Sequence, residues 1–225
     1  DSGAYADKHV VMHRTTALVS NELMEFPFII DVMKAESPDV HTYDLPFHYS
    51  GHLIDSNFDC TKSGAMLVPM EGGFGYEHLW QESHTQYKGE KATFSFTFLN
   101  DNRFYSVTTT ATHDASAFTA RIGANDPHRN LRSEPAVIFR QEGMSNHVFA
   151  SVVEPHGLYD LQLELTRDAN AQVKNIEVVS DDADYTAVRI TTRTGHTMTF
   201  VAVNRNFDDF FFALVESVFS LGGRS

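Results

Sequence analysis

The sequence is poor in the features that mark a disulfide-bonded or membrane-spanning protein. Its 225 residues include one cysteine, Cys60, so an internal disulfide is excluded and cysteine usage says nothing about the redox compartment. No apolar run approaches the roughly 20 residues that span a bilayer. The most apolar stretch, FFFALVESVF at 210–219, is interrupted by Glu216. We therefore expect no transmembrane segment, and we expect Cys60 to be a buried or half-buried thiol.

Targeting signals and familiar catalytic motifs are also missing. The chain begins DSGAYADKHV, with neither a methionine nor a signal-peptide pattern, so we expect a processed or otherwise partial polypeptide. A nucleophile elbow, a phosphate-binding loop, a dinucleotide fingerprint and a zinc knuckle are all absent from the sequence. Any activity must therefore be inferred from less specific arrangements of residues.

Basic residues are scarce. Lysine and arginine number 17 against 30 aspartates and glutamates, which gives a formal net charge of −13. Binding to phosphate groups needs a basic face, so this balance argues against nucleic acid and anionic membranes as partners. An acidic substrate could bind only at a locally basic site.

The hydrophobic pattern that is present has a period of two. In KATFSFTFLN (91–100), Phe94, Phe96 and Phe98 alternate with hydroxyl residues, as in a half-buried strand. The following NDN at 100–102 suits a tight turn, so we expect a hairpin with the strand that begins near residue 103. MEFPFIIDVM (24–33) alternates in the same way.

Short strand candidates continue along the whole chain, separated by clusters of glycine, asparagine, aspartate and proline. No segment combines a sustained helical period with caps at both ends. We therefore predict an all-β, antiparallel, multi-stranded β-sandwich of two stacked sheets that forms a single domain over residues 1–225. The further candidates are 9–19, 46–54, 117–123, 136–141, 147–154, 173–180, 185–192, 196–204 and 210–219.

One stretch reverses the charge of the chain. RIGANDPHRNLRSEPAVIFR (121–140) contains four arginines and two acids, a local balance of 4 − 2 = +2. Arginine binds carboxylates through two parallel hydrogen bonds, so the cluster could hold an acidic sugar. Alternatively, Asp126 and Glu134 pair with Arg129 and Arg132 and fix a long loop.

A second polar stretch, SVVEPHGLYD (151–160), ends a predicted strand. Its Glu154, His156 and Tyr159 could act as an acid, a base or a ligand for substrate. The alternative is that Pro-His-Gly simply forms a turn between strands, which requires no chemistry.

Two weaker candidates complete the set. His41, His48 and His52 could hold a metal, but His48 and His52 would stand about 13 Å apart along a straight strand. Trp80, with Tyr76 and His78 expected on the same face of a strand, could form an aromatic platform for sugar rings or could pack in the core.

Taken together and in order, these stretches resemble a known family. VMHRTTALV, FIIDVMKAESPDVHTYDLPFHYSGHLI, GYEHLWQES, FTFLNDNRFYSVTT, RIGANDPHRNLRSEPAVIFR and SVVEPHGLYD, between residues 9 and 205, resemble the C-terminal β-sandwich region of the heparinase II/III-like polysaccharide lyases. The resemblance is closest to the oligoalginate lyases of polysaccharide lyase family 17. Its most specific parts are the fifth and sixth stretches.

The resemblance implies a β-eliminating, exo-acting oligoalginate lyase whose N-terminal α/α toroid carries the catalytic residues. Neither those residues nor the family's metal ligands, including a structural zinc site, have a counterpart in this chain. We therefore expect the chain alone to be inactive, to hold no cofactor, and to line the substrate cleft opposite the toroid. The resemblance also implies a periplasmic or secreted enzyme. A stand-alone module that binds acidic polysaccharide is the alternative. The residues expected to contact substrate are Glu154, His156, Arg121, Asn125, Arg132 and Tyr159.

Overall fold

Antiparallel strands make up nearly all of the regular structure. The computed structural model describes residues 9–62, 64, 66–73, 75–87, 91–122, 133–204 and 213–217, with the backbone alone for 91, 92 and 213–217. Within these ranges the one helical element is a short 3-10 turn, η2 (Tyr76–His78), so the predicted all-β, antiparallel class is confirmed. The strands are β1 (Val11–Val19), β2 (Phe28–His48), β3 (His52–Ser56), β4 (Val68–Pro69), β5 (Leu79–Gln86), β6 (Lys91–Asn100), β7 (Arg103–Thr112), β8 (Ala115–Ile122), β9 (Glu134–His156), β10 (Leu158–Asp160), β11 (Leu165–Arg167), β12 (Val173–Asp181), β13 (Tyr185–Thr192), β14 (Thr197–Val203) and β15 (Ala213–Ser217).

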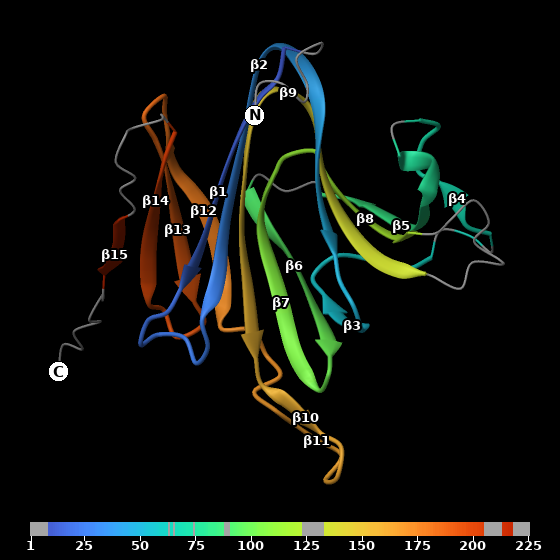
Figure 1. The fold of residues 1–225 in the computed structure, drawn as a ribbon, viewed down its shortest axis with the longest axis vertical. Coiled ribbons are helices and arrows are strands. Elements are labelled where there is room, and N and C mark those ends of the chain that lie inside the picture. The colour runs from blue at the N-terminus through green and yellow to red at the C-terminus, as the bar shows by residue number, and fades with distance from the viewer. Residues whose placement is uncertain are drawn as a thin grey trace.

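Two long strands form the centre of the fold. β2 has 21 residues and β9 has 23, against about 5–6 in an average strand. They pair along almost their whole length, from Ile29 opposite Val153 to His48 opposite Ala136. The register shifts between Glu36 and Tyr43, and both strands turn over near the top of Figure 1. The two strands therefore form one bent ribbon.

The bend folds the largest sheet back on itself. This sheet has nine strands, in the order β3-β6-β7-β9-β8-β5-β4, with β2 paired to β9 and β1 paired to β2. β8 pairs with the first half of β9, and β7 pairs with the second half. The two halves enclose an aromatic core in which Phe94 stacks on Phe139 with ring centroids 5.3 Å apart. The core also includes Phe96, Val107, Ala117, Val137 and Phe149.

A third layer covers the other face of the ribbon. The four-stranded sheet β12-β13-β14-β15 stands beside β1, β2 and β9 in Figure 1, on the side away from β4, β5 and β8. Alternate residues of β2 and β9 pack against it in a second core, which contains Phe28, Ile30, Val32, Ala150, Val152, Ile176, Val188, Ile190, Met198 and Phe200. The fold therefore has three layers, one more than the two stacked sheets that the sequence predicted.

The predicted hairpin is confirmed at the level of individual residues. β6 and β7 pair from Lys91 opposite Thr112 to Asn100 opposite Arg103. The two turn residues, Asp101 and Asn102, have φ values of 46° and 65°, as the commonest two-residue hairpin turn requires.

Two of the differences between the predicted strands and the structure are each accompanied by a glycine. The segments 136–141 and 147–154 are parts of the single strand β9, which contains Gly143 at a φ of 71° near the register shift. The segment 46–54 is instead divided between β2 and β3. There Gly51 has a φ of 103°, and a Cβ on it would lie 2.0 Å from the carbonyl oxygen of Leu99.

Cys60 is half-buried, as expected, and its Sγ lies 3.2 Å from the Oγ of Ser56. Burial raises the pKa of the Cys60 thiol. In the part of the chain that the structure describes, no helix has the length and apolar character needed to cross a membrane.

His147 on β9 makes the stability of the fold sensitive to acid. This residue is 8% exposed, and its ring packs edge-on against Phe149 with centroids 4.3 Å apart. Burial lowers the pKa of His147 from 6.5 to about 4. The unfolded chain therefore binds a proton between these pH values that the folded chain does not bind, so stability falls as the pH drops from 6.5 to 4.

We predict that His147→Gln removes up to about 3 kcal/mol of this pH-dependent loss. The free energy of unfolding would be measured by urea denaturation at several pH values between 4 and 7. The exposed His52→Gln should keep the slope of the unmodified protein. An unchanged slope in His147→Gln would contradict the assignment.

Candidate functional site

Glu154 lies near the end of β9 and is 1% exposed. Its two carboxylate oxygens accept hydrogen bonds from the backbone N–H groups of Gln172 and Val173, the second at 2.8 Å. Burial raises the pKa of Glu154, while these bonds and the nearby charges of His156 and Arg193 act in the opposite direction. Glu154 therefore anchors the start of β12 to the central ribbon.

His156, the last residue of β9, is fixed on both sides of its ring. Its Nδ1 lies 2.9 Å from the carbonyl oxygen of Asp168, which can only accept, so Nδ1 carries a proton. In the neutral ring, Nε2 then accepts from the Oγ of Ser106 at 2.8 Å. The Ser106 Oγ in turn lies 2.6 Å from the Oγ1 of Thr97. These bonds connect β9, β7 and β6 with the segment before β12.

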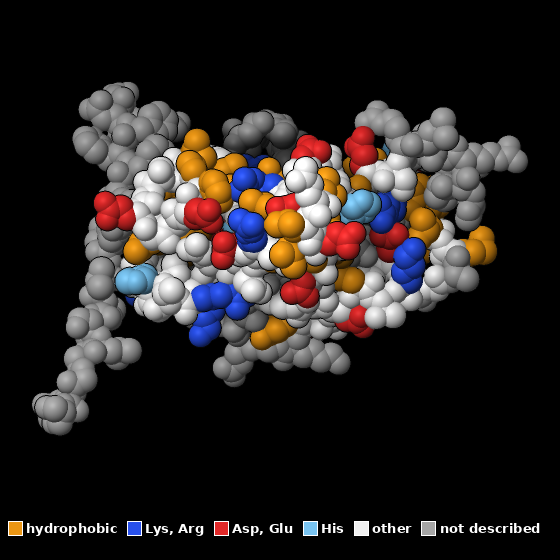
Figure 2. All heavy atoms as spheres, turned by 90° about the horizontal axis from the view of Figure 1, so that it is seen from below, with side chains coloured by type: hydrophobic (Ala, Val, Ile, Leu, Met, Phe, Trp, Pro, Cys, Tyr) orange, Lys and Arg blue, Asp and Glu red, His pale blue; other side chains and the backbone are white. Residues whose placement is uncertain are grey.

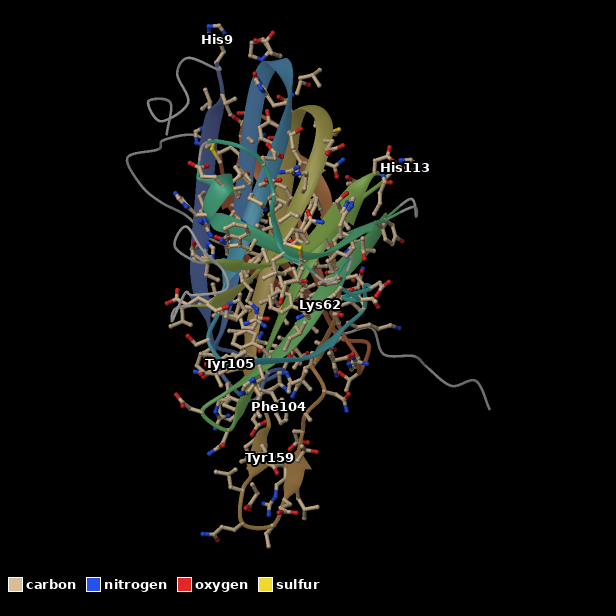
Figure 3. The ribbon with its side chains drawn as sticks, turned by 90° about the vertical axis from the view of Figure 1, so that its right-hand side faces the viewer. His9, Lys62, Phe104, Tyr105, His113 and Tyr159 are labelled. Carbon is tan, nitrogen blue, oxygen red and sulfur yellow. The ribbon has the colours of Figure 1, made fainter. Side chains whose placement is uncertain are left out.

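Tyr159 lies on the small β10–β11 hairpin. Its backbone N–H donates to the carbonyl oxygen of Asn102 at 2.7 Å. Figure 3 shows Tyr159 on the projecting hairpin, below Phe104 and Tyr105 of β7. The rest of the hairpin exposes large apolar side chains, namely Leu161, Leu163 and Leu165.

A hollow of about 260 Å³ opens beside His156. Its cation is Arg193, in the turn between β13 and β14, which the sequence patterns did not single out. The signal available in the sequence was slight, because TTRTG reads as an ordinary turn after a strand. The other lining residues include Glu25, Asp168, Asn170, Gln172 and Thr194.

Arg121 lies at the other end of the bent sheet, on β8. Its Nε lies 3.2 Å from the Oε2 of Glu82 on β5. A hollow of about 530 Å³ opens there. Burial raises the pKa of Tyr49, which lines this hollow, to about 12, although the charge of Arg121 opposes the shift. Other lining residues are Gly51, His52, Ser133 and Glu134.

Arg140, the last arginine of the basic stretch, is committed to a structural network. Its Nε and Nη2 each lie 2.8 Å from a carboxylate oxygen of Asp44 on β2. Its Nη1 lies 2.8 Å from Glu71, and the hydroxyl of Tyr76 donates to Asp44. These acids raise the pKa of Arg140. Arg140 is therefore paired with residues outside the stretch, as Arg121 is.

The structure places the predicted contact residues in two groups. Arg121 is opposite Pro135 near the start of β9, and Glu154 lies 154 − 135 = 19 residues farther along that strand. Asn125 and Arg132 lie outside the described residues. The burial and bonding of Glu154 explain a structural role, and its contact with substrate stays a prediction.

The three histidines considered for a metal site do not form one. His41 Nε2 lies 2.9 Å from the Oγ of Ser37, His48 ends β2 and His52 begins β3. Among the described residues, no three side chains of histidine, cysteine, aspartate or glutamate lie together as metal ligands would. These residues therefore do not fit a zinc ion.

The prediction that Tyr76, His78 and Trp80 share one face of a strand is wrong. Tyr76 and His78 belong to the 3-10 turn η2, so they do not alternate along a strand with Trp80, which lies on β5 opposite Arg121. Trp80 is half-buried.

Gly157 provides a direct test of the junction around His156. A Cβ on Gly157 would lie 2.2 Å and 2.3 Å from the carbonyl oxygens of Arg167 and Asp168. We predict that Gly157→Ala lowers the free energy of unfolding by about 3 kcal/mol or more, because the backbone must move.

Gly143→Ala is the matched control, since Gly143 also has a positive φ but has no atom within 4 Å of the added Cβ. It should cost about 1–2 kcal/mol, the penalty of the left-handed conformation alone. Equal losses in the two variants, measured by urea denaturation, would show that the close backbone contact is unimportant.

Comparison with known proteins identifies relatives that match three quarters or more of the chain. No protein-family model matches it. It is 36% identical over 172 residues to an exo-oligoalginate lyase of Saccharophagus degradans, a match that covers 75% of this chain and 23% of the relative. It is 31% identical over 182 residues to an alginate lyase of Stenotrophomonas maltophilia, covering 80% of this chain and 24% of the relative.

The chain thus spans about a quarter of the length of these curated relatives. The β-sheet architecture and both matches agree with the expected C-terminal region of such an enzyme. They confirm the predicted resemblance: this chain is homologous to a segment of the alginate lyases.

Proposed function

We propose that this chain is the β-sheet portion of a lyase that degrades alginate-type oligouronates by β-elimination and acts from the chain end. The observation that carries the proposal is the 36% identity over 172 residues to an exo-oligoalginate lyase. The acidic composition does not oppose it, because the two hollows contain arginine at particular places, Arg121 in one and Arg193 in the other.

The reaction sets requirements that this chain meets only in part. A proton next to a uronate carboxylate is weakly acidic, so the enzyme must neutralise the carboxylate, remove the proton and protonate the leaving oxygen. Tyr49 is a poor base at neutral pH because burial raises its pKa to about 12. Both ring nitrogens of His156 are already bonded. We infer that the base and the acid come from another part of the enzyme.

We propose that this other part is an N-terminal α/α toroid that faces the β-sheets across the substrate cleft. The exposed leucines of the β10–β11 hairpin support a contact of this kind, since exposed apolar patches commonly mark interaction surfaces. Any structural zinc would be held by that part. We place the enzyme in the periplasm or outside the cell, where a polymeric uronate substrate would be met.

A chimera provides the test. The matching quarter of the Saccharophagus degradans lyase would be replaced by this chain, and the unsaturated product would be followed by its ultraviolet absorbance on oligoalginate. We expect the chimera to release product and the isolated chain to release none. Circular dichroism and a thermal melt would establish that the chimera is folded.

A folded chimera without activity, alongside an active parent, would overturn the proposal. If the isolated chain nevertheless bound oligoalginate, that result would favour a stand-alone module that binds acidic polysaccharide.

A further inference from the structure

A polar groove lies between the β3–β6–β7 edge of the large sheet and the segment that leads into β12. Its volume is about 260 Å³, just below the range of typical small-molecule pockets, which suits one sugar unit. The alternation of β6 explains its chemistry: Phe94 and Phe96 face the core, so the hydroxyl residues between them face the groove. The hydroxyl and amide residues that line it are Ser56, Asn57, Thr93, Ser95, Thr97, Ser106, Thr108 and Asn170.

The hydroxyl groups of the floor are held in place. Ser106 and Thr108 are 1% and 2% exposed. When the His156 ring is neutral, Ser106 donates to His156 and accepts from Thr97, whose Oγ1 lies 2.6 Å from the Ser106 Oγ. The Thr97 oxygen is then left to accept a hydrogen bond from a ligand hydroxyl. A fixed acceptor of this kind costs little conformational entropy when a ligand binds.

Two cations line the same groove, Lys174 and Arg193, against a single acid, Asp55. Neither cation lies within 4.0 Å of a carboxylate in the described part of the chain. Arg193 is held by its own backbone and side chain: its N–H donates to Gln172 O at 2.8 Å, and its Nε donates to Ala171 O at 2.6 Å. Among the described residues, no carboxylate pairs with its two Nη groups.

The buried carboxylate of Glu154, on which the charge of Arg193 acts, does not compete for Arg193. Both of its oxygens accept from the backbone N–H groups of Gln172 and Val173. The charge of Arg193 acts on Glu154 only at longer range. In a chain of net charge −13, this leaves Arg193 available to an anion from outside.

We propose that this groove binds one uronate unit of an acidic oligosaccharide, with the carboxylate on Arg193 and Lys174 and the sugar hydroxyls on the polar floor. Guanidinium groups recognise carboxylates through paired hydrogen bonds. The adjoining hollow shares Arg193 but also contains Glu25 and Asp168, which repel a second carboxylate. The groove is therefore selective for a single charged unit. The inference rests on the proposed function only for the identity of the sugar.

Figure 2 views the molecule from the end at which β10 and β11 project. Basic, acidic and apolar side chains are interspersed over this face, without a continuous basic surface. A long polyanion would meet acids on most of this face, whereas one carboxylate can be held at the groove.

The test is titration calorimetry of the full chain with an alginate trisaccharide, with neutral mannotriose and with sodium acetate. We expect the charged trisaccharide to bind, and the neutral sugar and the simple carboxylate to bind at least about tenfold more weakly. Arg193→Gln and Lys174→Gln should each weaken the trisaccharide by roughly tenfold.

The matched control is Arg189→Gln on β13, the strand that ends just before Arg193; Arg189 is exposed and pairs with Glu177 at 3.0 Å outside the groove. It should leave the affinity unchanged. Thermal melts would verify that the variants are folded, which we expect because Lys174 and Arg193 are exposed.

Three results would overturn the groove proposal: no binding of the trisaccharide at millimolar ligand, equal binding of neutral mannotriose, or no effect of Arg193→Gln relative to Arg189→Gln. An inactive chimera combined with binding that depends on Arg193 would remove the lyase assignment and keep the groove. An active chimera combined with binding that is insensitive to Arg193→Gln would keep the lyase assignment and remove the groove proposal.

Discussion

The pairing of β2 with β9 is the constraint on which the rest of the structure depends. This ribbon contributes residues to both main cores: Phe139 and Phe149 to one, and Phe28, Ile30 and Val152 to the other. Because successive side chains of a strand point to opposite faces, one pair of strands can serve two cores at once. A slip of one residue in the register of a strand would turn its side chains to the opposite faces, so that those of one core would point into the other. The bend then allows β7 and β8 to use different halves of the same edge of β9.

Buried polar contacts hold the third layer to this ribbon. Lys34 on β2 is 4% exposed, and its Nζ lies 3.0 Å from Asp181 Oδ1 and 2.8 Å from the carbonyl oxygen of Asp182. Glu154 forms a second junction through the backbone at the start of β12. Buried charged groups of this kind are costly unless they are paired. The presence of polar residues at the end of β9 is therefore explained by the contacts that join the third layer to the ribbon.

The pairing of arginines with acids in the folded chain determines which arginines are available to an acidic sugar. The two described arginines of the basic stretch, Arg121 and Arg140, are paired with acids from other strands. Arg193 and Lys174 come from a part of the sequence with no cluster of basic residues, yet they stand at a groove rich in hydroxyl groups. The chemistry of an acidic-sugar lyase needs a cation at one carboxylate rather than a basic surface, so a strongly acidic chain can still take part in it.

Local patterns predicted the elements of the fold that depend on neighbouring residues. The alternation in 91–100 predicted β6, and Asp101 and Asn102 predicted its turn, because side-chain direction and turn geometry are set within a few residues. The order of the motifs also predicted the relatives. The joining of 136–141 and 147–154 into one strand was not predicted, since Gly143 reads equally well as a break.

By itself, then, the sequence determined an antiparallel all-β chain related to alginate lyases. It also singled out Glu154 and His156 as candidate substrate-contact residues. Only the tertiary structure decided that there are three layers, that Arg121 lies at the opposite end of β9 from Glu154, and that Arg193 stands beside His156. The reason is physical. Alternation and turn preference act between near neighbours, whereas the partners of a buried carboxylate or an arginine are chosen by strand pairing between residues far apart in the chain.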